Sequence, residues 1–202
     1  PTGTIGVRGT QFVVKIEDTL FDHPLFPLLI RDIVQLQKVG IRVVIVPGAR
    51  KTIDHLLKTY ESESQFHLGV RLTSEEAMPL VMLAAMTVSQ QLLSQLSANG
   101  ATGVLGNWVR ARGLGVLKGI DYGKTGQVER IRSDAIQDLL DQDFIPIVAN
   151  LGWNKLGQIY NINSNEIASA LCAKLNVTKL LMITPEGGLK ADGFSLPEGV
   201  QA

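Results

Sequence analysis

Short apolar strands alternate with segments of helical periodicity, and this alternation constrains the fold more than any other feature of the sequence. Residues 12–16 are apolar and β-branched apart from Lys15, which is typical of a strand buried on both faces. Apolar residues recur at helical spacing over 26–36, Gly40 ends that segment, and a second buried strand is expected at 41–46. A strand, a crossover helix and a second strand imply right-handed parallel pairing. We therefore expect an α/β three-layer sandwich with a mainly parallel central sheet.

The remainder of the chain continues this pattern with one interruption. Residues 73–76 are expected to form a capping box before a long helix that runs to Leu96. From 103 to 131 the pattern changes to short strands separated by glycines, in which 118–126 is expected to be a hairpin end or mobile loop over a site. Further elements are expected as a helix at 133–141, strands at 144–149 and 157–160, a helix at 163–175 and a buried strand at 179–184.

Composition places the chain among ordinary soluble globular proteins. Its 202 residues can bury one substantial core, and 45% are hydrophobic and 19% charged. Basic and acidic residues number 19 each, so no net charge attracts nucleic acid or an anionic membrane. Apolar runs fall short of the ~20 residues that a membrane helix needs. The single Cys172 lies in an apolar run, which favours a small buried side chain over a nucleophile. We expect a cytoplasmic protein.

The beginning of the chain suggests that it is a piece of something longer. Residues 1–9 contain no initiator Met and lack the apolar middle of a signal peptide. We therefore expect a fragment or a trimmed chain.

Two candidate sites follow the first two strands. A charged side chain at the end of a buried strand must be solvated or paired, so Lys15 is either functional or a lysine that extends past the sheet edge. Gly48 and the N–H groups after it lie between a strand and a helix, where free backbone donors favour an anion. The alternative for Gly48 is a simple turn. Because open α/β sheets bind ligands at the carboxyl ends of their strands, we favour a site that includes Lys15.

Later segments supply candidates for binding a carboxylate. Arg71 precedes the long helix and suits a bidentate grip on a carboxylate, although a surface arginine is the default interpretation. Asn161, Asn163 and Asn165 lie close together at the start of a helix. One of them explains a helix cap, but three amides within five residues are more than one cap needs.

Other chemistry finds little support in the sequence. Asp121, Glu129 and Asp134 lack metal-coordination spacing, so we expect them in solvent, and we expect no metal site. The glycines at 113 and 115 lack the third glycine of a dinucleotide fingerprint, and there is no P-loop consensus.

Four segments, taken in order, resemble motifs of the amino acid kinase family, and more closely those of its acetylglutamate branch. They are residues 12–15, 45–54, 69–73 and 160–168. The resemblance implies that Lys15 faces phosphate in the kinases, that Gly48 and Ala49 line the substrate site, that Arg71 holds the α-carboxylate and that Asn161 binds the acylated amino acid.

Departures from the kinase pattern point to the synthase form of the family. Glu17 and Asp18 replace a glycine pair, and negative side chains there would repel phosphate oxygens. Residues 48–50 have the synthase form, and Asn165 stands where the kinases have an aspartate. Since phosphoryl transfer depends on positioning and electrostatics, these departures argue against kinase activity.

The resemblance thus implies a partial kinase-like domain over 1–202 that regulates an N-acetylglutamate synthase and is itself catalytically silent. It implies N-acetylglutamate or glutamate as ligand, arginine as effector, a homo-oligomer, no cofactor in this fragment and acetyl-CoA for the parent protein, whose acetyltransferase domain would lie outside the chain. The residues implied to bind substrate are Gly48, Ala49, Arg71, Asn161 and Asn163, with Lys15 and Asn165 vestigial. Alternatives are an acetylglutamate kinase that uses ATP and Mg²⁺, and a stand-alone binding module with an unrelated ligand.

Overall fold

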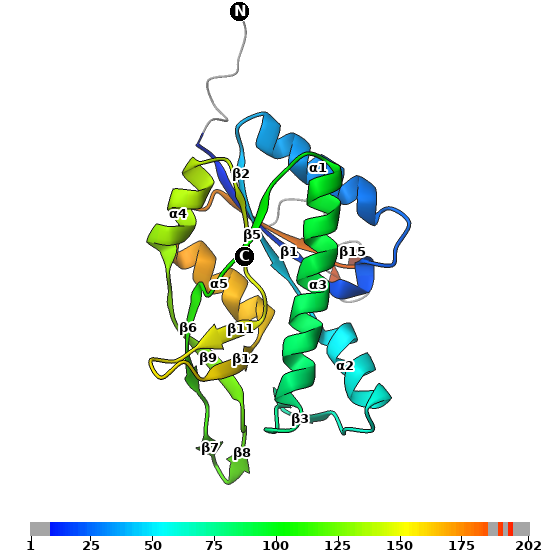
Figure 1. The fold of residues 1–202 in the computed structure, drawn as a ribbon, viewed down its shortest axis with the longest axis vertical. Helices are drawn as coiled ribbons and strands as arrows, with labels where there is room; N and C mark the ends of the chain where they lie inside the picture. The colour runs from blue at the N-terminus through cyan, green and yellow to red at the C-terminus, as the bar shows by residue number, and fades with distance from the viewer. Residues whose placement is uncertain (1–8, 186–189, 192–193, 196–202) are drawn as a thin grey trace, which may run out of the picture.

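A five-stranded parallel sheet forms the centre of the molecule (Figure 1). The computed structural model describes residues 9–185, 190–191 and 194–195, so the expectations for the first eight residues and for 186–189 lie outside it. The sheet order is β13-β1-β2-β10-β5, and every pairing in it is parallel. The strands are β1 (Gln11–Ile16), β2 (Arg42–Pro47), β5 (Gly103–Leu105), β10 (Ile145–Ile147) and β13 (Lys179–Ile183). The predicted parallel sheet is confirmed.

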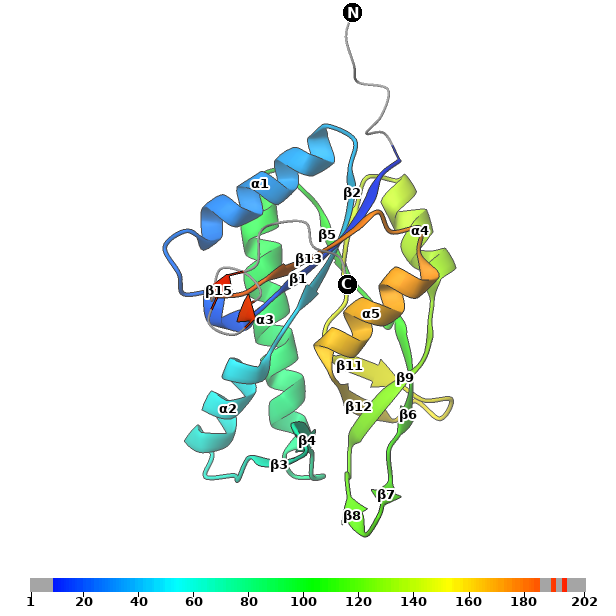
Figure 2. The same cartoon turned by 180° about the vertical axis from the view of Figure 1, so that it is seen from behind.

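Helices cover both faces of the sheet and complete the three layers (Figures 1 and 2). The helices are α1 (Phe26–Lys38), α2 (Arg50–Thr59), α3 (Met78–Ala98), α4 (Ser133–Asp141) and α5 (Ser164–Lys174). Alternation along β1 separates the layers, since Val14 packs with the core beneath α1 and α3 while Val13 packs with the core beneath α4 and α5.

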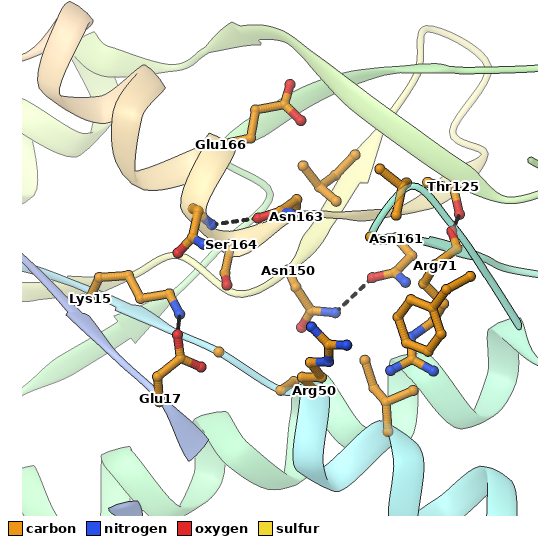
Figure 3. Close-up of a pocket in the computed structure, with 18 of the residues that line it drawn as sticks. Lys15, Glu17, Arg50, Arg71, Thr125, Asn150, Asn161, Asn163, Ser164 and Glu166 are labelled. Carbon is orange, nitrogen blue, oxygen red and sulfur yellow. Dashed lines mark hydrogen bonds and ion pairs between the residues drawn. The ribbon is translucent and has the colours of Figure 1, made fainter. Parts of the chain in front are cut away.

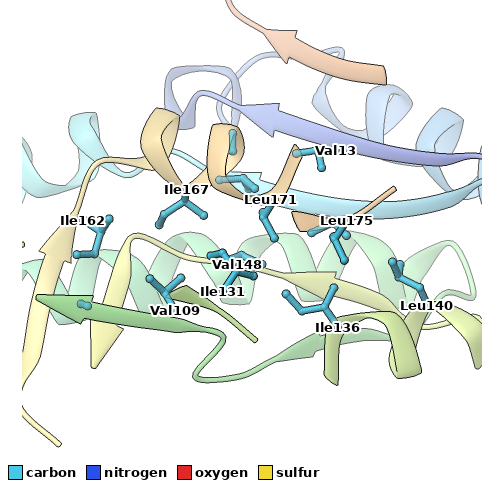
Figure 4. Close-up of a cluster of buried hydrophobic side chains, with 14 residues drawn as sticks. Val13, Val109, Ile131, Ile136, Leu140, Val148, Ile162, Ile167, Leu171 and Leu175 are labelled. Atoms are coloured by element: carbon cyan, nitrogen blue, oxygen red, sulfur yellow. The ribbon is translucent and has the colours of Figure 1, made fainter. Parts of the chain in front are cut away.

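The core beneath α4 and α5 joins the sheet to a second, smaller β structure (Figure 4). Ile136 from α4 and Leu171 from α5 are fully buried there beside Val109 and Ile162. Val109 and Ile162 belong to a small closed barrel, which consists of β6 (Val109–Gly113), β9 (Thr125–Ile131), β11 (Leu151–Trp153) and β12 (Ile159–Ile162). This shared core fixes the barrel and the N-terminus of α5 against the sheet, where the cavity lies.

Short hairpins and turns complete the described structure. They are η1 (Asp18–Leu20), β3 (Gln65–His67) with β4 (Val70–Leu72), β7 (Val116–Leu117) with β8 (Ile120–Asp121), and β14 (Lys190–Ala191) with β15 (Phe194–Ser195). The β7–β8 hairpin extends away from the sheet (Figure 1). Among the described residues, no helix combines the length and the apolar character that crossing a bilayer requires.

The expected capping box before the long helix is wrong. Helix α3 begins at Met78 with Ala77 as N-cap, and Pro79 occupies its first turn, where a missing N–H costs no helical hydrogen bond. Ser74 Oγ accepts from the N–H of Ala77 at 3.1 Å and so closes a preceding turn. Thr73 instead turns its hydroxyl toward the barrel.

The expectation that the last strand is buried is also wrong. Leu180 and Met182 of β13 are exposed to 40% and 47%. In the described part of the chain β13 pairs with β1 alone and therefore forms an edge of the sheet. Exposed apolar edges favour association, so self-association of the protein stays a prediction.

Candidate functional site

A cavity of about 760 Å³ lies where β1, β2 and β10 end, between the sheet and the barrel (Figure 3). This is the edge at which open parallel sheets bind ligands. All the residues singled out from the sequence as site residues line it, namely Lys15, Gly48, Ala49, Arg71, Asn161, Asn163 and Asn165. The topology therefore brings together residues that lie up to 150 positions apart. Their roles stay predictions. Of the described residues 118–126, Thr125 and Gly126 line the cavity, whereas the hairpin tip does not cover it.

Lys15 is buried at the end of β1 and forms an ion pair with Glu17. Its side chain is 2% exposed, and Nζ donates to Glu17 Oε1 (Figure 3). The two residues are two positions apart in an extended chain, so their side chains emerge on the same side. A Cβ at Gly48 would come within 2.9 Å of Glu17 Oε2 and 3.1 Å of Lys15 Nζ. Gly48 therefore leaves room for the ion pair. The positive charge of Lys15 at the cavity is offset by the carboxylate of Glu17.

Asp18 does not face the cavity, which corrects the expectation that both acids lie beside Lys15. It is 3% exposed and lies at the N-terminus of α2. Its carboxylate accepts from Lys51 N at 3.2 Å, from Thr52 N at 2.7 Å and from Thr52 Oγ1 at 2.8 Å. Helix N-termini favour anions because their first N–H groups lack helical partners. The anion position predicted after Gly48 is thus partly filled by the protein's own carboxylate.

Arg71 is buried and lines the cavity, so the default interpretation as a surface arginine is wrong. It lies on β4 and is 9% exposed. Its guanidinium donates to Asp54 Oδ1 at 2.6 Å and to Ser64 Oγ, and it stacks over the Phe66 ring at 4.5 Å. Arg50 stacks over the same ring at 4.8 Å. The stacking and the ion pair fix one end of the guanidinium at the cavity wall.

The asparagines divide between a helix cap and a buried network. Asn163 is the N-cap of α5, where Oδ1 accepts from Asn165 N at 2.8 Å. Asn161 is buried on β12 and makes two side-chain hydrogen bonds, from Asn150 Nδ2 at 3.0 Å and to Thr73 Oγ1 at 3.1 Å. Capping therefore explains Asn163, as the simpler interpretation held, but it does not explain Asn161.

Several cavity residues were not identified from the sequence. Arg50, Phe66, Thr125 and Asn150 all line the cavity. Arg50 begins α2 within the motif at 45–54, and Thr125 begins β9 within the segment 118–126 that was expected over a site. No local motif marks Phe66 on β3 or Asn150 after β10. A polar Asn150 directly after a buried strand was the available signal, since strand ends meet at this edge.

Other polar groups noted in the sequence lie elsewhere. Asp121, Glu129 and Asp134 are exposed, as expected. Cys172 is partly buried on α5 against the core, and burial raises the pKa of its thiol. A raised pKa keeps the thiol protonated at neutral pH, which argues against a nucleophile.

Fold and cavity together define the class of protein. The sequence model of the amino acid kinase family matches residues 10–194, and the chain belongs to this family. Isopentenyl phosphate kinase shares the fold, with a TM-score of 0.60 at 13% identity over 89% of this chain and 73% of that one.

More similar proteins are acetyltransferases. The amino-acid acetyltransferase of Pasteurella multocida is 33% identical over 96% of this chain and 42% of its own length, and that of Escherichia coli K12 is 33% identical over 92% and 44%. The crystal structure of N-acetylglutamate synthase from Neisseria gonorrhoeae, complexed with coenzyme A and L-arginine, superposes with a TM-score of 0.88 at 26% identity, over 95% of this chain and 47% of that one. The chain thus spans less than half the length of these relatives.

Proposed function

We propose that the chain is the kinase-like domain of an N-acetylglutamate synthase, which binds a small carboxylate ligand and transfers no phosphoryl group. The observation that carries the proposal is the neutralised mouth of β1. Lys15 is paired with Glu17, and Asp18 occupies N–H groups at the start of α2.

Electrostatics at this position supports the loss of kinase chemistry. A phosphoryl group needs cations and free N–H donors around its oxygens, and charge stabilisation supplies most of its catalysis. Here Glu17 places negative charge where those oxygens would approach Lys15. Asn165, at the start of α5, lines the same cavity and carries no charge. In this proposal Lys15 and Asn165 are vestigial.

The opposite side of the cavity suits a carboxylate. Arg71 and Arg50 present guanidinium groups stacked on Phe66, and the amide of Asn161 lies beside them (Figure 3). Guanidinium groups bind carboxylates with charge-assisted hydrogen bonds. Asp54 and Ser64 already hold part of Arg71, so we propose that a ligand carboxylate takes its remaining donors and those of Arg50.

The relatives support the choice of ligands. Structures of the Neisseria gonorrhoeae synthase contain coenzyme A with L-arginine or with N-acetylglutamate. For this chain we propose N-acetylglutamate or glutamate as ligand and arginine as effector, with acetyl-CoA serving the protein that carries the chain. We propose a cytoplasmic location for that biosynthetic role.

Calorimetry and a coupled kinase assay test the proposal. Titration with N-acetyl-L-glutamate should give saturable binding, and Arg71→Ala should weaken it by about 10-fold or more, as expected for losing a charge-assisted hydrogen bond. Arg31→Ala, at an exposed arginine of α1, is the matched control and should leave the affinity unchanged. ADP release that depends on acetylglutamate with Mg²⁺ and ATP would overturn the proposal in favour of an acetylglutamate kinase. Saturable binding of neither acetylglutamate nor arginine would favour a module with another ligand.

A further inference from the structure

Four buried polar side chains form one continuous chain of hydrogen bonds along the cavity wall. Asn150 Nδ2 lies 3.0 Å from Asn161 Oδ1, and Asn161 Nδ2 lies 3.1 Å from Thr73 Oγ1. Thr73 Oγ1 lies 2.9 Å from Thr125 Oγ1, which lies 2.5 Å from the carbonyl oxygen of Arg71. The chain links β12, β9 and β4 to the loop after β10.

The last member fixes the direction of every hydrogen bond in this chain. A carbonyl oxygen accepts and never donates, so the hydroxyl hydrogen of Thr125 must point to Arg71. Thr125 Oγ1 then accepts from the hydroxyl of Thr73, and this bond uses the single hydrogen of the Thr73 hydroxyl. Thr73 can therefore only accept from the next member.

The same logic orients both amides. Asn161 must turn Nδ2 toward Thr73, which leaves Oδ1 to accept from Asn150. Asn150 must then present Nδ2 to Asn161 and keep its own Oδ1 at the open end of the chain. Asn150, a residue that lines the cavity, thus keeps its acceptor free, and the opposite amide orientation would break the hydrogen-bond chain.

That open end is unsatisfied. Asn150 is 4% exposed, and its Oδ1 has no hydrogen-bond partner among the residues that the structure describes. Buried polar atoms are almost always paired, so an unpaired acceptor in a residue that lines a cavity is consistent with a donor supplied by a ligand. In Figure 3 the side chain of Asn150 lies between Asn161 and the Lys15–Glu17 pair, in the middle of the labelled residues.

We propose that Asn150 is a specificity-determining residue that accepts a hydrogen bond from an N–H group of the ligand, held in that role by the chain through Asn161, Thr73 and Thr125. With guanidinium groups on the same cavity, the ligand class is a small acid that also carries an N–H group, such as an N-acylated amino acid. This inference rests on the proposed function, whose carboxylate site it extends.

Two ligands that differ at one atom separate this role from simple binding. N-Acetyl-L-glutamate offers an amide N–H, whereas 2-acetoxyglutarate replaces it with an ester oxygen that would face the oxygen of Asn150. Calorimetry on the unmodified chain should show the amide bound about 10-fold more tightly or better, as a site built for a donor rejects an analogue without one. Asn150→Ala should bring the ratio of the two affinities toward one.

A second variant tests the hydrogen-bond chain and leaves Asn150 in place. Thr125→Val removes the hydroxyl that anchors the direction, which frees Thr73 to donate to Asn161 and lets both amides reverse. The ratio of affinities should again fall toward one. Thr87→Val is the matched control, because Thr87 also donates its hydroxyl to a backbone carbonyl, at 2.8 Å, but on α3. Thermal melting should confirm that each variant is folded.

An Arg50→Ala variant tests whether Arg50, and not the ligand, is the hydrogen-bond partner of Asn150. If its guanidinium were the missing partner of Asn150, Arg50→Ala would change the ratio; under our proposal it lowers both affinities by the same factor. Equal affinity of the unmodified chain for the two ligands would overturn the role of Asn150 and leave the proposed function intact. Binding of neither would overturn the proposed function and, with it, the ligand class.

Discussion

The two sides of the cavity differ in how far the protein satisfies its own polar groups. At the mouth of β1, Lys15 is paired with Glu17, and Asp18 fills donors of α2. On the barrel side, the hydrogen-bond chain stops at the unpaired oxygen of Asn150. Both sides include residues at the ends of sheet strands, with Lys15 on β1 and Asn150 after β10. We propose that the β1 side has therefore lost its ligand. The other side would retain one, because Arg71 keeps donors beyond those that Asp54 and Ser64 accept and Asn150 keeps a free acceptor.

Breaking the Lys15 ion pair should have the largest effect on stability. Glu17→Leu leaves a buried ammonium group without its counter-charge, and removal of one partner of a buried pair is strongly destabilising. Because Glu17 is partly exposed, we expect a loss of about 3 kcal/mol in the free energy of unfolding, measured in urea. The double variant Lys15→Met, Glu17→Leu removes both charges and should recover most of that loss. A single variant as stable as the unmodified chain would show that Lys15 is not held by Glu17.

Removing the carboxylate at α2 should have the next largest effect. Asp18→Ala leaves the N–H groups of Lys51 and Thr52 without a partner, and loss of a cap with charge-assisted bonds should cost about 2 kcal/mol. Asp22→Ala is the control. Asp22 is exposed and pairs with the side chain of Lys51, so its loss should cost less than about 1 kcal/mol. Equal losses for the two variants would mean that Asp18 is no more than a surface charge.

The two amides of the barrel side should respond differently to removal. Asn161→Leu removes the centre of the hydrogen-bond chain and leaves a partner on each side without its hydrogen bond. We expect it to lower the free energy of unfolding by about 2 kcal/mol. Asn150→Leu deletes an unsatisfied oxygen together with one hydrogen bond, so it should cost roughly 1 kcal/mol less than Asn161→Leu. Chemical denaturation of both variants measures the difference. A larger loss at Asn150 than at Asn161 would contradict an unpaired oxygen there.

Local sequence patterns explain why the sheet and helices were predictable while parts of the site were not. The spacing of apolar residues and the helix-ending glycine place β1, α1 and β2 almost to the residue. The parallel order then follows from the handedness of crossovers. The error at α3 has a physical cause, because a Ser followed by Glu also closes a simple turn, and Pro79 sets the true start of the helix.

Within the site, the sequence identified residues that carry charge or repeat a motif. Lys15, Arg71 and Asn161 stood out in this way. Asn150 did not, because its meaning depends on a hydrogen-bond chain between segments far apart in sequence. Asp18 was misplaced although alternation of side chains in an extended segment could have separated it from Glu17, since neighbours point to opposite sides.

The smallest expected effect is the response of the unmodified chain to phosphate. Ligand binding to the folded state raises the melting temperature in proportion to the logarithm of ligand concentration over its dissociation constant. With Glu17 on Lys15, phosphate should raise it by less than about 1 °C beyond sodium chloride of equal ionic strength. Glu17→Gln keeps the shape, removes the repelling charge and frees the ammonium group, so phosphate should then stabilise that variant in a saturable way. Glu129→Gln, at an exposed glutamate, should behave like the unmodified chain. Saturable stabilisation of the unmodified chain would mean that the β1 side still accepts an anion, and the contrast between the two sides of the cavity would no longer hold.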